Sequence, residues 1–278
     1  MIIFNKTNEI AEYLQNLQNS GKTTGFVPTM GALHRGHLSL INQAQQSNNV
    51  VICSIFVNPT QFNDPADLEK YPRPLAEDIK KLEEAGCDIL FSPAVNEMYA
   101  DNEQWHLNIG ELEHLLEGEF RPGHYQGVMQ IVYKLFNIVK PDKAYFGQKD
   151  YQQFMVIGKM VELMHLPVKL VMCPIEREAD GLAMSSRNIH LSATDRQHAL
   201  ILSKTLKWVK DHFDKNNIAQ LQAEAAKQIS NEPGVHPEYF VIADGDTLHP
   251  VKQNTTNFVA LVAARVGNTR LIDNMILL

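Results

Sequence analysis

The chain has 278 residues, of which 44% are hydrophobic and 21% are charged. This balance is ordinary for a soluble globular protein, and the length suffices for one large domain or two smaller ones. The formal net charge of −7 comes from 25 Lys and Arg against 32 Asp and Glu, which argues against a protein that wraps a long nucleic acid.

Short apolar runs alternate with helical patterns over the first 175 residues. The run 50–57 is almost wholly apolar, as a strand covered on both faces is. We expect strands at 24–27, 50–57, 88–91, 143–146 and 168–173, and helices at 35–47, 75–85, 127–139 and 151–165. This α/β alternation predicts a parallel sheet with helices on both faces.

The pattern changes after Pro174. A polar loop over 176–188 leads to Ser192, which is well suited to cap a helix. A second helix over about 218–230 follows, and then strands near 238–242, 257–265 and 270–273. We therefore predict two domains, residues 1–175 and a smaller α+β domain over residues 176–278.

The cysteines and the start of the chain indicate where the protein resides. Cys53, Cys87 and Cys173 are far apart, and two lie in apolar runs, so we interpret them as buried and reduced. The first residues lack a basic region followed by a long apolar stretch, and no run approaches the ~20 apolar residues that a membrane span needs. We expect a cytoplasmic protein that binds neither membrane nor nucleic acid.

Residues 28–37 read PTMGALHRGH and lie between a predicted strand and a predicted helix. A helix N-terminus has unpaired N–H donors and a positive partial charge, which suit a phosphate group. His34 and His37 are three residues apart and so share a helical face, while Gly36 leaves the backbone open to a ligand. This H-x-G-H pattern predicts a nucleotide-phosphate site, the alternative being a chance match.

Amide and charged side chains follow two later strands. Asn58 and Gln61 suit a hydroxylated or carboxylated small substrate, or else they cap a turn. Lys149 suits ATP phosphates, or else it is a solvated lysine on an ordinary capped helix. Gly147 allows close approach of a nucleotide to the backbone, and Asp150 suits a helix cap, a ribose hydroxyl or Mg²⁺.

Three further segments have weaker patterns. Residues 185–187 (SSR) make a compact anion clamp or a solvated turn. The segment 120–125 has Gly and Pro hinges and is typical of a mobile flap. Asp78 is a candidate for water-mediated contact with Mg²⁺, although a solvated helix face is the favoured interpretation. Since ligands bind beyond the carboxyl ends of parallel strands, we expect the motif-bearing segments to converge at one edge of the sheet.

The motifs together resemble the pantoate–β-alanine ligase (pantothenate synthetase) family. The resemblance covers about residues 24–190 and is carried by residues 28–37, 56–62, 71–73, 146–150 and 180–188. It implies a Rossmann-like first domain that binds nucleotide and pantoate, a smaller lid domain and a homodimer. It also implies a reaction in which pantoate, β-alanine and ATP give pantothenate, AMP and pyrophosphate through a pantoyl adenylate, with Mg²⁺ accompanying ATP.

The resemblance also implies roles for individual residues. His37 would be the proton-donating catalytic residue, assisted by His34 and Lys149. Gln61 and Gln153 would hold pantoate, Gln61 lying also near β-alanine, and Asn58 would support the pantoate end. Glu176 matches a nucleotide-contacting position where relatives often have a small apolar residue. The remaining ATP-binding positions would be Met30, Gly31, Ala32, Leu33, Arg35, Gly36, Gly147, Gln148, Asp150, Met184, Ser185, Ser186 and Arg187.

Three other classes of protein share parts of this pattern. A nucleotidyltransferase that keeps AMP in its product has the same H-x-G-H turn, and only the appearance of free AMP separates the two. A fragment related to aminoacyl-tRNA synthetases would need a basic RNA-binding extension, which the acidic balance does not supply. A non-catalytic nucleotide sensor would not need the amides of Asn58, Gln61 and Gln153.

Overall fold

The computed structural model describes residues 1–101 and 103–278. Its contacts divide the chain into two compact units. The first contains Met1–Gly147 and Gln152–Cys173, and the second contains Gln148–Tyr151 and Pro174–Leu278. A four-residue segment that the sequence places within the first domain therefore groups with the second unit.

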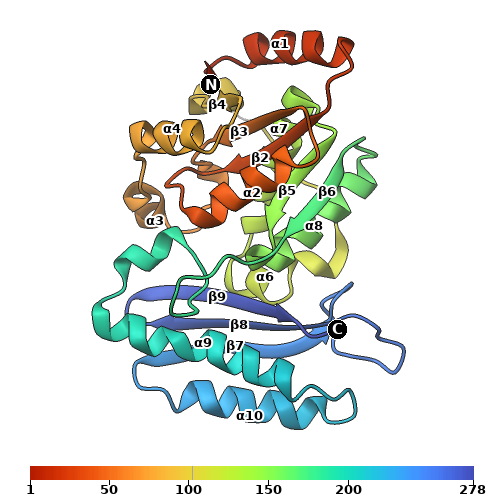
Figure 1. Ribbon diagram of the computed structural model, residues 1–278. Coiled ribbons are helices and arrows are strands. Elements are labelled where there is room, and N and C mark those ends of the chain that lie inside the picture. Colours follow the sequence, from red (N-terminus) through yellow and green to blue (C-terminus); the bar gives the residue numbers. More distant parts are fainter. Residues whose placement is uncertain (102) are drawn as a thin grey trace. The chain divides into compact units, whose positions relative to one another are not determined.

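The first unit is built on a six-stranded sheet in the order β1-β4-β3-β2-β5-β6, and all of its strand pairs are parallel (Figure 1). This confirms the predicted parallel sheet. The edge strand β1 was not predicted, because three residues are too few to show a pattern. The strands are β1 (Ile2–Phe4), β2 (Thr24–Thr29), β3 (Val50–Ile55), β4 (Ile89–Phe91), β5 (Lys143–Gly147) and β6 (Lys169–Cys173).

Helices cover both faces of this sheet, as predicted. One core joins the face that includes Phe26 and Ile52 to the helices α1 (Thr7–Asn19), α7 (His124–Val139) and α8 (Tyr151–Leu163). The other core joins Val27 and Cys53 to α2 (Arg35–Gln45) and α4 (Leu75–Glu84). Successive residues along β2, and likewise along β3, thus point to opposite faces of the sheet. Because both faces are covered by apolar cores, β3 shows no alternation of polar and apolar residues.

Short elements connect these layers. Helix α7 begins three residues earlier than predicted, at His124, and His124 and Tyr125 are buried. The second half of the expected flap is therefore packed into the core and is not a free loop. The short elements of the first unit are η1 (Pro59–Gln61), α3 (Pro65–Lys70), α5 (Val95–Met98), η2 (Gly110–Glu113) and α6 (Glu117–Phe120).

The second unit is an antiparallel sheet with two helices (Figure 1). Its strands β7 (Val235–Asp244), β8 (Phe258–Val266) and β9 (Thr269–Ile276) pack through a separate apolar core against α9 (Ala193–Asp211) and α10 (Ile218–Ser230). Ser192 caps α9 by accepting the backbone N–H of Asp195, as its position predicted. Two 3-10 turns, η3 (Gln148–Asp150) and η4 (Ser186–His190), also belong here. Across the described parts of both units, no helix has the length and apolarity needed to cross a bilayer.

Candidate active site

The turn between β2 and α2 carries the H-x-G-H pattern and is held by a buried acid. Gly31 and Ala32 have positive φ values of 82° and 51°. The carboxylate of Asp78, which is 1% exposed, accepts the backbone N–H groups of Ala32 and Leu33 at 2.8 Å each. Lys81 donates to the carbonyl of Leu33 at 2.8 Å. Asp78 does not lie on a solvated helix face, and that favoured interpretation was wrong because its carboxylate serves this turn.

The two histidines of the motif lie against each other at the start of α2. Their ring centroids are 4.0 Å apart, and the backbone N–H of His34 donates to Nδ1 of His37 at 3.3 Å. When Nδ1 accepts a hydrogen bond, the proton of a neutral imidazole is on Nε2. His37 therefore has Nε2–H as its donor, which suits a developing negative charge on a phosphate.

The loop after β3 is organised around the buried amide of Asn58. Its Nδ2 donates to Oε1 of Gln61 and to the carbonyl of Gly127, both at 3.1 Å. Its Oδ1 accepts hydrogen bonds from Thr60 Oγ1 at 3.2 Å and from the Tyr99 hydroxyl at 2.6 Å. The amide of Asn58 is thus engaged on both sides, and it orients the side chain of Gln61.

Gln61 connects this loop to the H-x-G-H turn. Its side-chain Nε2 donates to Sδ of Met30 at 3.0 Å. Its main-chain carbonyl oxygen lies 2.8 Å from Nδ1 of His124. A Cβ atom at Gly127 would lie 2.3 Å from the carbonyl oxygen of Thr60, so only glycine allows α7 to pass this close. The structure therefore brings two predicted segments, 30–37 and 58–61, into direct contact.

The segment that follows β5 also carries predicted site residues, and this strand ends at Gly147. Strands β3, β2 and β5 are neighbours in the sheet and parallel, so their carboxyl ends adjoin. A Cβ atom at Gly147 would meet no atom within 4 Å, so the space beside its backbone is open. Gln153 is half-buried in the first turns of α8, which follows this strand end.

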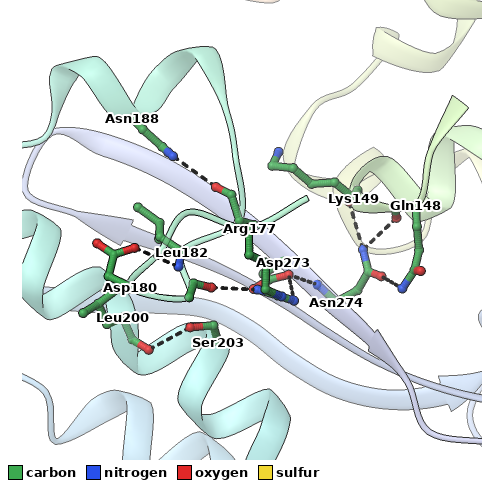
Figure 2. Close-up of polar contacts among 12 residues, drawn as sticks. Gln148, Lys149, Arg177, Asp180, Leu182, Asn188, Leu200, Ser203, Asp273 and Asn274 are labelled. Carbon is green, nitrogen blue, oxygen red and sulfur yellow. Dashed lines mark hydrogen bonds and ion pairs between the residues drawn. The ribbon is translucent and has the colours of Figure 1, made fainter. Parts of the chain in front are cut away.

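Lys149 and Asp150 belong to the second unit, in the 3-10 turn η3. Both Gln148 and Lys149 use their carbonyl oxygens to accept hydrogen bonds of 2.9 Å from Nδ2 of Asn274 (Figure 2). The Gln148 side chain donates to Oδ1 of Asn274 at 3.0 Å. The main chain of this turn is therefore tied to strand β9, while Lys149 is half-buried and Asp150 is exposed.

The loop 176–188 of the second unit is closed by its own main chain. The carbonyl oxygen of Glu176 accepts the N–H of Met184 at 3.0 Å, which joins the two ends of the loop. Ser185 caps η4 by accepting the N–H of Arg187 at 3.2 Å. The predicted anion clamp thus forms the start of a short helical turn.

The comparisons with known proteins decide the family. The family model described as pantoate-beta-alanine ligase matches residues 2–276. The chain belongs to the pantoate–β-alanine ligase family. A pantothenate synthetase of Thermotoga petrophila is 46% identical over 279 residues, with 100% of both chains covered.

Solved structures of this family have the same fold. The pantothenate synthetase of Thermus thermophilus has a TM-score of 0.93 and 39% identity, covering 99% of both chains. The ligase of Francisella tularensis, solved with β,γ-ATP and β-alanine, has a TM-score of 0.82 and 37% identity, covering 99% of this chain and 97% of that one. The expected family, the Rossmann-like fold with its smaller α+β part, and the ligase activity are confirmed. The three other protein classes are set aside.

Mg²⁺ is expected to accompany ATP, so the described residues were compared with the ligand sets that hold such an ion. Within residues 1–101 and 103–278, no three His, Cys, Asp or Glu side chains form a group that could hold a metal ion. Both carboxylate oxygens of Asp78 already accept backbone N–H groups. Mg²⁺ is commonly held by substrate phosphates with one or two carboxylates.

Sequence reasoning missed Tyr99, His124 and Asn274, which contact predicted residues of the family site. Tyr99 and Asn58 are 41 residues apart, and Asn274 and Gln148 are 126 apart. No local pattern marks such pairs. Of the three, His124 alone lies in a segment that the sequence marked, 120–125, where it follows Pro122 and Gly123.

Proposed function

We propose that this protein joins pantoate to β-alanine through a pantoyl adenylate, releasing AMP and pyrophosphate. The observation that carries the proposal is the β2–α2 turn, where Asp78 fixes the main chain and His34 fixes the tautomer of His37. That turn lies in a chain that is aligned over its whole length with a pantothenate synthetase.

The first half-reaction needs stabilised charge on a phosphate. A carboxylate is a poor electrophile, so pantoate must be activated before an amine can attack it. Its carboxylate oxygen attacks the α-phosphorus of ATP in line, the bond to the bridging oxygen breaks, and pyrophosphate leaves. Negative charge grows on the phosphate oxygens, and positioned donors carry most of such catalysis. His37 donates its Nε2–H to this charge, assisted by His34 and the N-terminus of α2.

Pantoate binds through two glutamine amides in this proposal. Gln61 and Gln153 hold its hydroxyl and carboxylate groups, because an amide both donates and accepts hydrogen bonds. Asn58 acts through Gln61: its Nδ2 fixes Oε1 of that side chain at 3.1 Å, which leaves the Gln61 side chain little rotational freedom. This support suits a residue that must discriminate one small acid.

ATP is bound by residues from several stretches of the chain in this proposal. One set of ATP-binding residues comprises residues 30–37 and Gly147, which has open space beside its backbone. The second unit contributes the cations Lys149 and Arg187, which neutralise phosphate charge. It also contributes Gln148, Asp150, Glu176, Met184, Ser185 and Ser186.

The second half-reaction needs a dry site. The amine of β-alanine attacks the acyl carbon of the adenylate, an amide forms and AMP leaves. Water would hydrolyse the mixed anhydride, and excluding it is the role that we assign to the carboxyl-terminal domain of residues 176–278. A homodimer and residence in the cytoplasm complete the proposal; the latter is supported by three free, buried cysteines.

A pyrophosphate-release assay tests this function. With ATP and pantoate alone, we expect at most one pyrophosphate per active site, because the adenylate stays bound. Addition of β-alanine is expected to start continuous turnover with equal amounts of AMP and pantothenate. Continuous AMP release without any amine, or none with all three substrates, contradicts the proposal.

A further inference from the structure

Two neighbouring residues of β9, Asp273 and Asn274, make hydrogen bonds to two loops of the second unit: Asn274 to Gln148 and Lys149, and Asp273 to Arg177 (Figure 2). Their exposed fractions are 4% and 2%, so a carboxylate and an amide are buried side by side in a strand. Buried polar groups are costly unless they are hydrogen-bonded. Their partners therefore show what these two side chains are for.

Asn274 binds the main chain of the turn that carries Lys149. Its two N–H donors reach the carbonyls of Gln148 and Lys149 at 2.9 Å each, and its oxygen accepts the side-chain N–H of Gln148 at 3.0 Å. One amide thus makes three hydrogen bonds to two successive residues. This arrangement fixes the direction in which the turn presents the Lys149 side chain.

Asp273 holds the second segment through Arg177. The guanidinium of Arg177 makes a bidentate contact with the carboxylate, at 2.7 and 3.0 Å. The same guanidinium donates to the carbonyl of Gly181 at 3.1 Å, and the main chain of Arg177 pairs with that of Ala183. Asp273 Oδ1 also accepts the backbone N–H of Asn274 at 2.8 Å. The carboxylate that binds Arg177 is therefore hydrogen-bonded to the residue that binds the turn of Lys149. The loop is thereby folded just before the clamp that contains Arg187.

We propose that Asp273 and Asn274 are positioning residues that set the two phosphate-binding segments, 148–150 and 184–187, in one fixed arrangement. The proposal rests on the proposed function, because it requires Lys149 and Arg187 to bind ATP. Both side chains are buried and are engaged by protein groups. They act by preorganising the cations, which reduces the ordering that ATP binding has to impose.

Steady-state kinetics of Asn274→Ala tests this inference. The loss of all three side-chain hydrogen bonds to Gln148 and Lys149 is expected to raise the KM for ATP about 10-fold, with the KM for β-alanine unchanged. Asn274→Asp is the second variant, since it keeps the volume and the acceptor for Gln148 but loses both donors. Asn257→Ala is the matched control: it removes two amide hydrogen bonds to Asp246 in the same unit without touching either segment.

A double-mutant cycle separates positioning from general stability. In a Lys149→Ala background, Asn274→Ala is expected to raise the KM for ATP less than two-fold, because the cation that it positions is gone. Additive effects of the two substitutions overturn the inference. So does an Asn274→Ala protein that melts at a lower temperature while its KM for ATP is unchanged. If the unmodified protein forms no pantothenate, the proposed function fails; if it does and the variants bind ATP normally, only this inference fails.

Discussion

The carboxylate of Asp78 accepts the backbone N–H of Ala32 at 2.8 Å, across 46 residues of sequence. Its other oxygen accepts the N–H of Leu33 at the same distance. Ala32 has a positive φ of 51°, which L-residues seldom adopt without help from neighbouring structure. Helix α4 thus supplies the anchor that keeps the H-x-G-H turn in its conformation.

Replacing that anchor is expected to weaken both the fold and the use of ATP. Asp78→Ala leaves two N–H groups without their acceptor, which costs roughly 2–4 kcal/mol of unfolding free energy. The KM for ATP should rise because the turn loses its fixed geometry. Urea denaturation and ATP-dependent kinetics measure the two effects, with the exposed neighbour Glu77→Ala as control. An Asp78→Ala protein with an unchanged free energy of unfolding would show that the turn keeps its conformation without the carboxylate of Asp78.

His37 is expected to matter in the chemical step more than in binding. His37→Ala should lower the rate of adenylate formation by roughly 10²-fold or more, the usual effect of losing a donor to developing charge. Single-turnover release of pyrophosphate measures this step. His236→Ala replaces an exposed histidine of β7 and should leave the rate unchanged. Full activity of His37→Ala at saturating ATP would refute the assignment.

Gln153 is expected to affect one substrate selectively. Gln153→Ala removes an amide that we assign to pantoate, so the KM for pantoate should rise more than the KM for ATP. A loss of one or two hydrogen bonds predicts a rise of roughly 5- to 50-fold. Kinetics with each substrate varied in turn separates the two constants. A larger effect on ATP would place Gln153 at the nucleotide instead.

Acid should remove a stabilising contact at the amino-terminal edge of the first unit. The N–H and hydroxyl of Thr7 and the ammonium of Lys6 donate to Glu97 and lower the pKa of its carboxyl from 4.5 to about 2. A group whose pKa is lowered by folding stabilises the fold above its unfolded pKa. That stability is lost as the pH falls through the folded value.

The window for this effect runs from pH 4.5 down to about 2. The difference in unfolding free energy between the unmodified protein and Glu97→Gln should be constant from pH 7 to 5 and shrink below 4.5. Chemical denaturation at a series of pH values measures it. A difference that persists unchanged at pH 2 would mean that the charge of Glu97 is not what stabilises the contact.

The strands and long helices were predictable from the sequence because their signals are local. The apolar run of β3 and the helical spacing of apolar residues in α2 each lie within a dozen residues. These patterns also predict which side chains of the two elements are buried. Strand β1 escaped prediction because its three residues carry no period and gain their structure from pairing with β4. The burial of His124 and Tyr125, in the second half of the flap expected at 120–125, was not predicted, because turn residues mark a break in the chain but not whether the next residues are buried.

The alternation of strands and helices, the H-x-G-H helix start and the family could all be predicted from the amino-acid sequence, since each depends on motifs whose residues are close together in the chain. The buried position of Asp78 and the grouping of Gln148–Tyr151 with the carboxyl-terminal unit became visible only in the folded chain. The same is true of the hydrogen bond from Asn274 to the turn of Lys149. Such hydrogen bonds join residues that folding brings together across long stretches of chain, and the side chains that make them have the same local pattern as any polar residue on a surface.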